Sequence, residues 1–481
     1  MSPDLDGERF FVVGWGELSG KLMPRLYSPS VVGFYEQLWA ADGARHLRDL
    51  VAHGYYGVLP PGDSYADDLP IRFIRSAEMN SDLDVDLDDC PSVEEQYYIK
   101  KAQVQKNDVL LAVKGATIAS RKCVAHVRGD VGKAIVNGSI YRMQVKPEVN
   151  PRFLAIVLST EMLKRQMRLA LTANNGVDYL DKSLIHHLVV PTPDRTAQDS
   201  LVAIYDTAMA ASITAKREAA ALLESIDDYL LGELGITLPP ETENTLANRT
   251  FRVAAHELGG WRFDPLFHAF KMWHAIEEAG IPSARLGAIC TSVKTGFAAG
   301  GNDQALDDGG IIQIRPTNID TDRRLKFDRN IYISADLATH RPREILKPGE
   351  VLFNNTNSQS LVGKSTFFDL TDQLYTCSNH ITRLTVCNDN AIAEYITAIL
   401  NLYQRRKAFF SICTNWNNQS GVGADLLRKI IVPVPEMDVQ QQIVGKITAI
   451  FVEAESLKTT ATTELETAKR EIEAILLGDA T

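Results

Sequence analysis

Several short segments hold residues that could bind phosphate or catalyse a reaction, but their spacing does not fit those roles. Gly363-Lys364-Ser365 ends like a phosphate-binding loop, which needs a further glycine where this chain has Ser358. Gly132-Lys133 fails in the same way, because Val127 stands in place of that glycine. The chain also lacks D/N-P-P-F/Y, H-E-x-x-H and G-x-S-x-G motifs. We therefore expect no catalytic centre in this chain, and a binding protein is the favoured interpretation.

The cysteine spacing argues against a metal centre or a disulfide framework. Six cysteines occur in 481 residues, and none forms a C-x-x-C pair. We interpret them as reduced thiols, and we expect no metal and no other cofactor.

The charge and hydropathy patterns argue against a membrane-spanning chain and against indiscriminate binding of polyanions. The formal net charge is −11, which argues against indiscriminate nucleic-acid binding but leaves room for a local basic face. No segment approaches the roughly 18 apolar residues of a membrane span, and residues 1–8 lack the parts of a secretion signal. We therefore expect a cytoplasmic protein without a membrane partner.

The second half of the chain repeats the first half at offsets of 240 to 242 residues. The matched segments, all in the same order, are Phe11–Gly20 with Phe251–Gly260, Phe73–Met79 with Gln313–Ile319, Asn107–Leu111 with Gly349–Phe353, and Leu184–Pro193 with Leu426–Pro435. Four ordered matches at a constant offset are the signature of an internal repeat. The chain is therefore predicted to contain one structural unit twice.

The repeat also bears on the only pair of adjacent histidines, His186-His187. The equivalent residues in the second half are Arg428-Lys429. A position that is histidine in one copy and basic in the other favours a solvent-facing or polyanion-facing site over a metal ligand.

Each unit is predicted to be a mixed β and α domain that ends at a Pro-x-Pro element. Short β-branched or aromatic runs predict strands at Ile71–Ile74, Val109–Val113, Val351–Phe353 and His380–Val386. Helical patterns cover Pro151–Leu171 and Ala391–Phe410. The Pro-x-Pro elements stop each domain, because proline fixes φ and disfavours helix in the preceding residue.

A long helix with a coiled-coil seam is predicted after each Pro-x-Pro. Apolar or small residues recur in alternating steps of four and three from Leu201 to Tyr229. The second series runs from Ile443 to Ile475 with one longer step before Leu465. Small residues in both seams allow close approach, so we predict that the two helices pair with each other in antiparallel fashion. The alternative is that each helix packs on its own domain or on another chain.

These features resemble the specificity (S) subunits of type I restriction–modification systems over essentially the whole chain. The most specific segment is the domain-to-helix junction Ile430–Ile443, with apolar residues, Pro-x-Pro and a glutamine-containing helix start. Arg262-Phe-Asp-Pro265 is a second familiar motif. The first copy departs from both patterns, with Arg25–Pro29 and Asp194–Gln198 at those places. The two halves therefore need not contact a partner in the same way.

The resemblance implies an α+β fold, with two mixed β/α target-recognition domains in a pseudo-twofold repeat joined by two long antiparallel coiled-coil helices. The expected boundaries are 1–195 for the first domain, 196–232 for the first spacer helix, 233–250 for a linker, 251–436 for the second domain and 437–478 for the second spacer helix. The chain would have no catalysis of its own. It would bind a bipartite double-stranded DNA target, one half-site per domain. Two methyltransferase (modification) subunits would dock on it and flip out the target adenine, and restriction/translocase subunits are further expected partners.

Two polar segments in each half carry side chains suited to DNA. Arginine and lysine pair with guanine or phosphate, and asparagine and glutamine pair with adenine. The scaffold is shared while these polar residues differ, as two domains reading different half-sites would require. The alternative is that they are turn residues. The candidate DNA-binding residues are Lys114, Thr117, Arg121, Lys122, Asn174, Asn175, Lys182, Asn354, Asn355, Thr356, Asn357, Lys364, Asn415, Trp416, Asn417 and Asn418.

A protein-binding adaptor is the alternative from a different class. It would be a duplicated coiled-coil scaffold in a defence or signalling assembly without DNA readout. A concave face between the domains lined by Lys114, Lys122, Asn355 and Lys364 would favour DNA binding, and an acidic face there would favour the adaptor.

Overall fold

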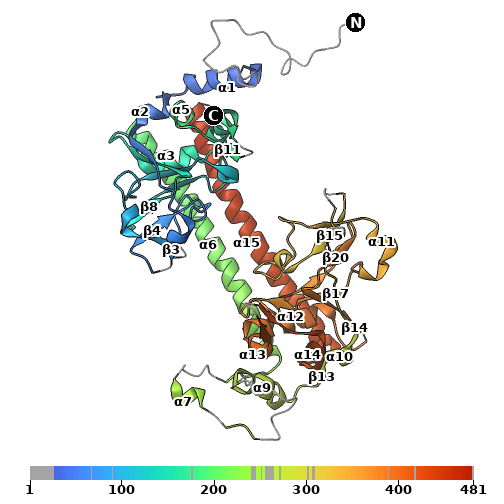
Figure 1. The fold of residues 1–481 in the computed structure, drawn as a ribbon. Helices are drawn as coiled ribbons and strands as arrows, with labels where there is room; N and C mark the ends of the chain where they lie inside the picture. The colour runs from blue at the N-terminus through green and yellow to red at the C-terminus, as the bar shows by residue number, and fades with distance from the viewer. Residues whose placement is uncertain are drawn as a thin grey trace, which may run out of the picture. The chain divides into compact units, whose positions relative to one another are not determined.

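The chain forms two compact units. The structure, a computed structural model, describes residues 27–66, 68–88, 90–174, 177–239, 245–250, 252–254, 265–269, 272–300, 303–305, 309–387, 389–416 and 419–478. Unit 1 comprises Met1–Arg217 and Leu457–Thr481, and unit 2 comprises Glu218–Ser456. Each unit combines a mixed β/α domain with a segment from each of two long helices (Figure 1). No helix within these ranges has both the length and the apolar character needed to cross a bilayer.

Unit 1 is built on two small four-stranded sheets. Its strands are β1 (Arg45–His46), β2 (Val51–Tyr56), β3 (Tyr65–Ala66), β4 (Ile71–Ile74), β5 (Ser92–Val93), β6 (Val109–Ala112), β7 (Val124–His126), β8 (Ala134–Val136), β9 (Ile140–Val145), β10 (Thr172–Asn174), β11 (Val177–Tyr179) and β12 (Val189–Val190). Its shorter helices are α1 (Pro29–Ala40), α2 (Leu47–Leu50), α3 (Pro151–Leu158), α4 (Glu161–Ala170) and α5 (Lys182–His186). The first sheet has the order β2-β9-β6-β7 and is antiparallel, whereas the second, β3-β5-β4-β8, pairs β4 with β8 in parallel.

Strand β6 is apolar throughout because both of its faces are covered. Val109 and Leu111 belong to the core that contains α3 and α4, while Leu110 and Ala112 belong to a second core with β8. Side chains alternate between the two faces of a strand, so a strand buried on both sides reads as a continuous apolar run. The predicted strand at Val109–Val113 is confirmed on this ground.

Unit 2 repeats this topology. Its strands are β13 (Ser283–Arg285), β14 (Cys290–Thr295), β15 (Ile311–Ile314), β16 (Tyr332–Ile333), β17 (Glu350–Asn354), β18 (Thr356–Asn357), β19 (Ser365–Phe368), β20 (Tyr375–Cys377), β21 (Ile381–Val386), β22 (Thr414–Trp416), β23 (Gln419–Gly421) and β24 (Ile431–Pro433). Its shorter helices are α7 (Leu246–Arg249), α8 (Pro265–Ala269), α9 (Met272–Glu278), α10 (Leu286–Ile289), α11 (Leu337–His340), α12 (Ala393–Arg405), α13 (Ala408–Ile412) and α14 (Ala424–Lys429). The order β14-β21-β17-β19 matches β2-β9-β6-β7, and β15 pairs with β20 in parallel as β4 does with β8. The predicted repeat is therefore present in the fold.

Two long helices follow the domains, α6 (Arg195–Glu233) and α15 (Met437–Leu477). In unit 1 the start of α6 shares a core with the end of α15 through Leu201, Tyr205, Met209, Leu465, Ile472 and Leu476. In unit 2 the end of α6 shares a core with the start of α15 through Ile226, Leu230, Ile443, Ile447 and Ile450. This order of contacts is that of an antiparallel pair, as the seams predict, and the shared apolar side chains stabilise it.

The same glutamine fixes each domain-to-helix junction. Gln198 is buried and donates its amide N–H to the carbonyl of Pro193 at 2.8 Å. Gln440, at the same place in the second copy, is buried and donates to Pro435 at 2.8 Å. In both copies the amide oxygen also accepts a backbone N–H from the domain. The first junction thus departs in sequence but keeps the contact that fixes the helix to the Pro-x-Pro element.

A histidine in β7 makes the stability of unit 1 sensitive to acid. His126 is buried, and neither ring nitrogen has a hydrogen-bond partner within the described part of the chain. Burial, together with the nearby charges of Arg152 and Arg128, lowers the pKa of His126 to about 4. The folded domain therefore holds a neutral imidazole, and protonation favours the unfolded chain.

We expect unit 1 to lose about 1 kcal/mol of stability between pH 7 and pH 5.5, because an unfolded histidine titrates near 6.5 and the folded one does not. His126→Phe, which places the residue that unit 2 has at this position (Phe367), should remove this loss. Urea unfolding at the two pH values measures it. The control is His187→Gln at an exposed histidine, and an equal acid response in wild type and His126→Phe would contradict the assignment.

Candidate nucleic-acid interface

In each unit the two polar segments meet at one β-hairpin. In unit 2, β18 pairs with β23, which is one strand of the hairpin β22–β23. In unit 1, the chain that leaves β6 pairs with the hairpin β10–β11 through an antiparallel bridge between Lys114 and Tyr179. We call residues 114–117, 172–174 and 177–179 the hairpin surface of unit 1. Residues 356–357, 414–416 and 419–421 form the hairpin surface of unit 2.

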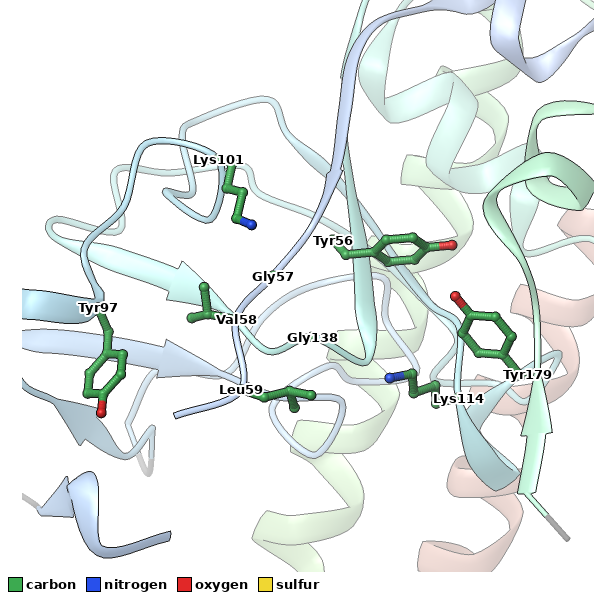
Figure 2. Close-up of a pocket in the computed structure, with 9 residues that line it drawn as sticks. All are labelled: Tyr56, Gly57, Val58, Leu59, Tyr97, Lys101, Lys114, Gly138 and Tyr179. Carbon is green, nitrogen blue, oxygen red and sulfur yellow. The ribbon is translucent and has the colours of Figure 1, made fainter. Parts of the chain in front are cut away.

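A pocket of about 520 Å³ opens beside the hairpin surface of unit 1 (Figure 2). It is lined by Tyr56, Gly57, Val58, Leu59, Tyr97, Lys101, Lys114, Gly138 and Tyr179. Figure 2 shows the amines of Lys101 and Lys114 entering it from different loops. The Lys114 amine lies 5.7 Å from the centre of the Tyr179 ring, within range of a cation–π contact. We call this site the lysine pocket.

Tyrosine hydroxyls form part of the lining of the lysine pocket. Tyr56 and Tyr179 face each other on one side of it (Figure 2). Burial raises the pKa of Tyr56, and the neighbouring Tyr179 hydroxyl raises it further. Ammonium and phenol groups suit phosphate oxygens and the acceptor edges of bases. The lining thus offers two ammonium groups and three phenol hydroxyls.

The structure separates the other predicted residues of unit 1. Thr117 lies half-buried in a single 3-10 turn beside the hairpin surface. Arg121 and Lys122 are exposed and do not line the lysine pocket, and the Arg121 Nε lies 4.0 Å from the Glu466 carboxylate on α15. Lys182 begins α5 and contacts the backbone of β2.

Two predicted residues of unit 1 are only partly described, and one site residue was missed. Asn174 ends β10, and Asn175 lies outside the described residues. Lys101 was not predicted, because it lies outside the repeated polar segments. The adjacent lysines Lys100-Lys101 were the available signal.

The hairpin surface of unit 2 carries an exposed tryptophan among amides. Trp416 is 47% exposed, and its ring covers Gly421, where an added Cβ would lie 2.4 Å from the Trp416 Cη2. Asn415 is exposed, and its Oδ1 accepts a hydrogen bond from the Ser420 hydroxyl at 2.5 Å. Asn417 and Asn418 lie outside the described residues.

Thr356 and Asn357 support the chain that leads into this surface. Both are half-buried in β18. The Thr356 hydroxyl donates to the Asn355 Oδ1 at 2.7 Å, and the Asn357 Oδ1 accepts the backbone N–H of Ser358 at 2.8 Å. Their side chains therefore have polar partners within the loop.

Three of the residues predicted to contact DNA in unit 2 are buried in the structure. Asn354 donates to the carbonyl of Leu361 at 3.3 Å, and Asn355 donates to the Thr382 hydroxyl at 2.9 Å. Lys364 donates its ammonium to the carbonyl of Ile319 at 2.8 Å, and burial lowers its pKa. All three are less than a tenth exposed. Their polar groups make hydrogen bonds inside the loop.

The described residues contain no group of three His, Cys, Asp or Glu side chains arranged to hold a metal ion. His186, one of the adjacent histidines, shares a hydrogen bond of 2.8 Å between its Nε2 and the Tyr141 hydroxyl. His186 therefore has a tyrosine hydroxyl as its hydrogen-bond partner, and both residues line a surface pocket.

No protein-family model matches the chain. No curated protein matches it either. Among solved structures, it is similar to a chain of a type I R-M system described for its complex assembly and conformational transition, with 15% identity over 91% of this chain and 98% of that chain, at a TM-score of 0.46. It is similar to the HsdS subunit from Thermoanaerobacter tengcongensis, with 14% identity, coverage of 91% and 97%, and a TM-score of 0.35. It is also similar to the S subunit of a type I restriction–modification system from M. genitalium, with 13% identity, coverage of 91% and 96%, and a TM-score of 0.37. Two of these three solved chains are described as S subunits of type I restriction–modification systems, the family that the sequence of this chain resembles.

Proposed function

We propose that this chain is the DNA-recognition component of a type I restriction–modification complex. Each domain binds one half-site of a bipartite duplex target, and the chain itself catalyses no reaction. The observation that carries the proposal is one fold present twice, with different side chains on the hairpin surface of each copy. A shared fold with a different reading surface is what recognition of two unlike half-sites requires.

The shared part includes a buried ion pair in the central sheet of each unit. Arg142 on β9 pairs with Asp108 at 2.9 Å, and both side chains are at most 5% exposed. Arg383 on β21 and Glu350 on β17 occupy the equivalent positions and pair at 3.5 Å. In both copies the pair therefore joins the same two segments of the central sheet.

The side chains that differ between the two units suit different kinds of base contact. Unit 1 presents the amines of Lys101 and Lys114, which suit guanine acceptors and phosphates. Unit 2 presents Asn415, which suits adenine, and Trp416, which can contact a base or an unstacked step. The two domains are therefore expected to read different sequences.

Catalysis in this proposal belongs to partner chains. Two methyltransferase subunits dock along α6 and α15, and restriction and translocation subunits complete the complex. The net charge of −11 supports a surface that mostly meets protein, because an acidic chain limits DNA contact to local basic sites.

Co-purification with the neighbouring subunits, followed by genome-wide mapping of methylated adenines, tests the proposal. The expected result is methylation at one bipartite motif with two separated halves. The isolated chain should bind that duplex in a salt-sensitive way and should neither methylate nor cut it. Absence of DNA binding by both the chain and the complex would favour the adaptor interpretation instead.

Removing both amines of the lysine pocket should weaken DNA binding. For Lys101→Ala/Lys114→Ala we expect about tenfold lower affinity, with the slope of log K against log salt reduced by about 1.8, as for two lost phosphate contacts. Fluorescence anisotropy across a salt series measures both quantities. The control Lys106→Ala/Lys347→Ala removes two exposed lysines that do not line the pocket. Equal losses in the two double variants would reject the pocket as a DNA contact.

A further inference from the structure

Unit 1 has a second pocket, separate from the lysine pocket, that is lined by basic side chains from three elements. It measures about 250 Å³. Its lining residues are Arg48, Val51, Ala52, His53, Gly54, Tyr55, Tyr141, Lys182 and His186. They come from α2, β2, β9 and α5. Four of them carry a cationic or titratable nitrogen and none of them is acidic, so the pocket suits an anion. We call it the basic pocket.

Hydrogen bonds hold the polar groups of the basic pocket in place. Lys182 donates its ammonium to the carbonyl of Gly54 at 3.3 Å and lies 5.9 Å from the centre of the Tyr141 ring. Burial raises the pKa of Tyr141 to about 12, so its hydroxyl is protonated and can donate to the Nε2 of His186 at 2.8 Å. In the tautomer in which Nε2 accepts this bond, the imidazole hydrogen lies on Nδ1, which can then donate.

Gly54 makes this arrangement possible. A Cβ at this position would lie 2.0 Å from the Tyr141 hydroxyl. Only a glycine therefore allows Tyr141 to pass the backbone of β2 and reach His186.

The charges around His186 are positive. Burial lowers its pKa, and the charges of Lys182, His187 and Arg48 lower it further. Of the neighbouring acids, Asp49 lies 3.7 Å from the Arg48 Nε, where both groups are half exposed. Asp181 accepts hydrogen bonds from the backbone and hydroxyl of Ser183. Nearby carboxylates therefore balance the positive charges of the pocket only weakly. A bound anion would reduce the repulsion between these positive charges.

Unit 2 has no counterpart of these side chains. Gly287 stands where unit 1 has Arg48, and Arg428 stands where it has His186. A Cβ at Gly287 would lie 2.9 Å from the Arg428 Cβ, so the arginine side chain covers that position. Its guanidinium donates to the carbonyl of Val293 at 2.7 Å and pairs with Asp425 at 3.1 Å. The basic pocket is therefore specific to unit 1.

We propose that the basic pocket binds a phosphate group through Arg48, Lys182 and His186. The inference rests on the proposed function, under which the phosphate belongs to the backbone of the duplex at the half-site of the first domain. A phosphate contact fixes the register of a protein on DNA and carries no sequence information. Lys182 is therefore a positioning residue, and base reading by this domain falls to its hairpin surface.

The test is a salt series of duplex binding by the full chain, with Arg48→Ala/Lys182→Ala as the variant. Both side chains are exposed, so the fold should survive, and circular dichroism checks it. We expect about tenfold weaker binding and a slope lower by about 1.8. The loss should be equal for the methylation motif and for a scrambled duplex. Lys106→Ala/Lys347→Ala is again the charge-matched control.

Histidine NMR separates the sources of the phosphate. Protein labelled with ¹⁵N-histidine is titrated with inorganic phosphate and, separately, with duplex DNA, and His186→Gln assigns the ring signals. A saturable shift of His186 with inorganic phosphate supports a general phosphate site, and a shift with duplex alone supports a phosphate presented by DNA. No shift with either ligand overturns the inference.

The salt series also separates failure of this inference from failure of the proposed function. If wild-type protein does not bind duplex at all, the proposed function fails. If wild type binds and the Arg48→Ala/Lys182→Ala variant keeps the full salt slope, only the basic pocket is rejected.

Discussion

Replacing Arg142 with methionine is expected to destabilise unit 1 by about 3–5 kcal/mol, because it leaves a buried carboxylate without its cation. Asp108 is 1% exposed, and its pKa is raised by burial even though the Arg142 charge lowers it. Its Oδ2 also accepts the backbone N–H of Gln105 at 2.8 Å, so Asp108 cannot turn outward without losing that contact. Urea unfolding followed by circular dichroism measures the change.

A second substitution at the partner position should reverse most of this loss. In Arg142→Met/Asp108→Asn the buried charge is gone, and the amide oxygen can still accept the Gln105 N–H. The loss of unfolding free energy caused by Arg142→Met alone should also become smaller as the pH falls toward 5. A carboxyl whose folded pKa is raised contributes stability at low pH that is lost as pH rises. The exposed pair Lys133–Glu95 provides the control, and Lys133→Ala should leave the urea midpoint unchanged. A double variant no more stable than Arg142→Met would contradict this account.

The strands and the repeat could be predicted from the sequence because their signals are local. Ile71–Ile74 was predicted as a strand and is β4. The match of Asn107–Leu111 to Gly349–Phe353 contained the acidic partners of both buried ion pairs. Their arginine partners lie on β9 and β21, and only the sheet register brings each pair together.

The predicted helices were less accurate than the strands, because local backbone features break a helix while the apolar periodicity of the sequence continues. The segment Pro151–Leu171 contains two helices, α3 and α4. Between them the hydroxyls of Ser159 and Thr160 donate to carbonyls of the preceding turn, each at 2.7 Å. Side chains of this kind compete with the helix backbone. The segment Ala391–Phe410 is likewise divided, at Lys407, whose φ of 63° is left-handed. The spacing of apolar residues does not reveal either of these two helix breaks.

Residue type alone could not decide which polar side chains face a ligand. Asn354, Asn355 and Lys364 have the chemistry of DNA contacts, yet the loop after β17 folds back over them and uses their hydrogen bonds internally. The lysine pocket shows the converse. Lys101 comes from the loop between β5 and β6 and Lys114 from the loop after β6, and only the fold brings both to the lining of one pocket.

Truncating Trp416 to alanine is expected to lower affinity for the cognate duplex by about 10- to 100-fold, the range for losing one aromatic contact with a base. The side chain is 47% exposed on β22, so its removal takes little from the core of unit 2. Gly421→Ala should have a similar effect, because the added methyl group would displace the ring from its present position. Trp416→Phe should restore part of the affinity. Fluorescence anisotropy with the methylation motif measures all three variants.

The decisive comparison uses duplexes in which only one half of the motif is scrambled. Under the proposed function, scrambling the second domain's half-site should weaken binding by Trp416→Ala less than it weakens binding by wild type, because the variant has already lost one of the contacts to that half-site. Scrambling the other half should weaken both proteins equally. Trp39→Ala is the matched control, because Trp39 is also 47% exposed but lies on α1 of unit 1, and it should bind as wild type does. If Trp416→Ala keeps wild-type discrimination at both halves, the hairpin β22–β23 does not read DNA, and base recognition by unit 2 must lie on another surface.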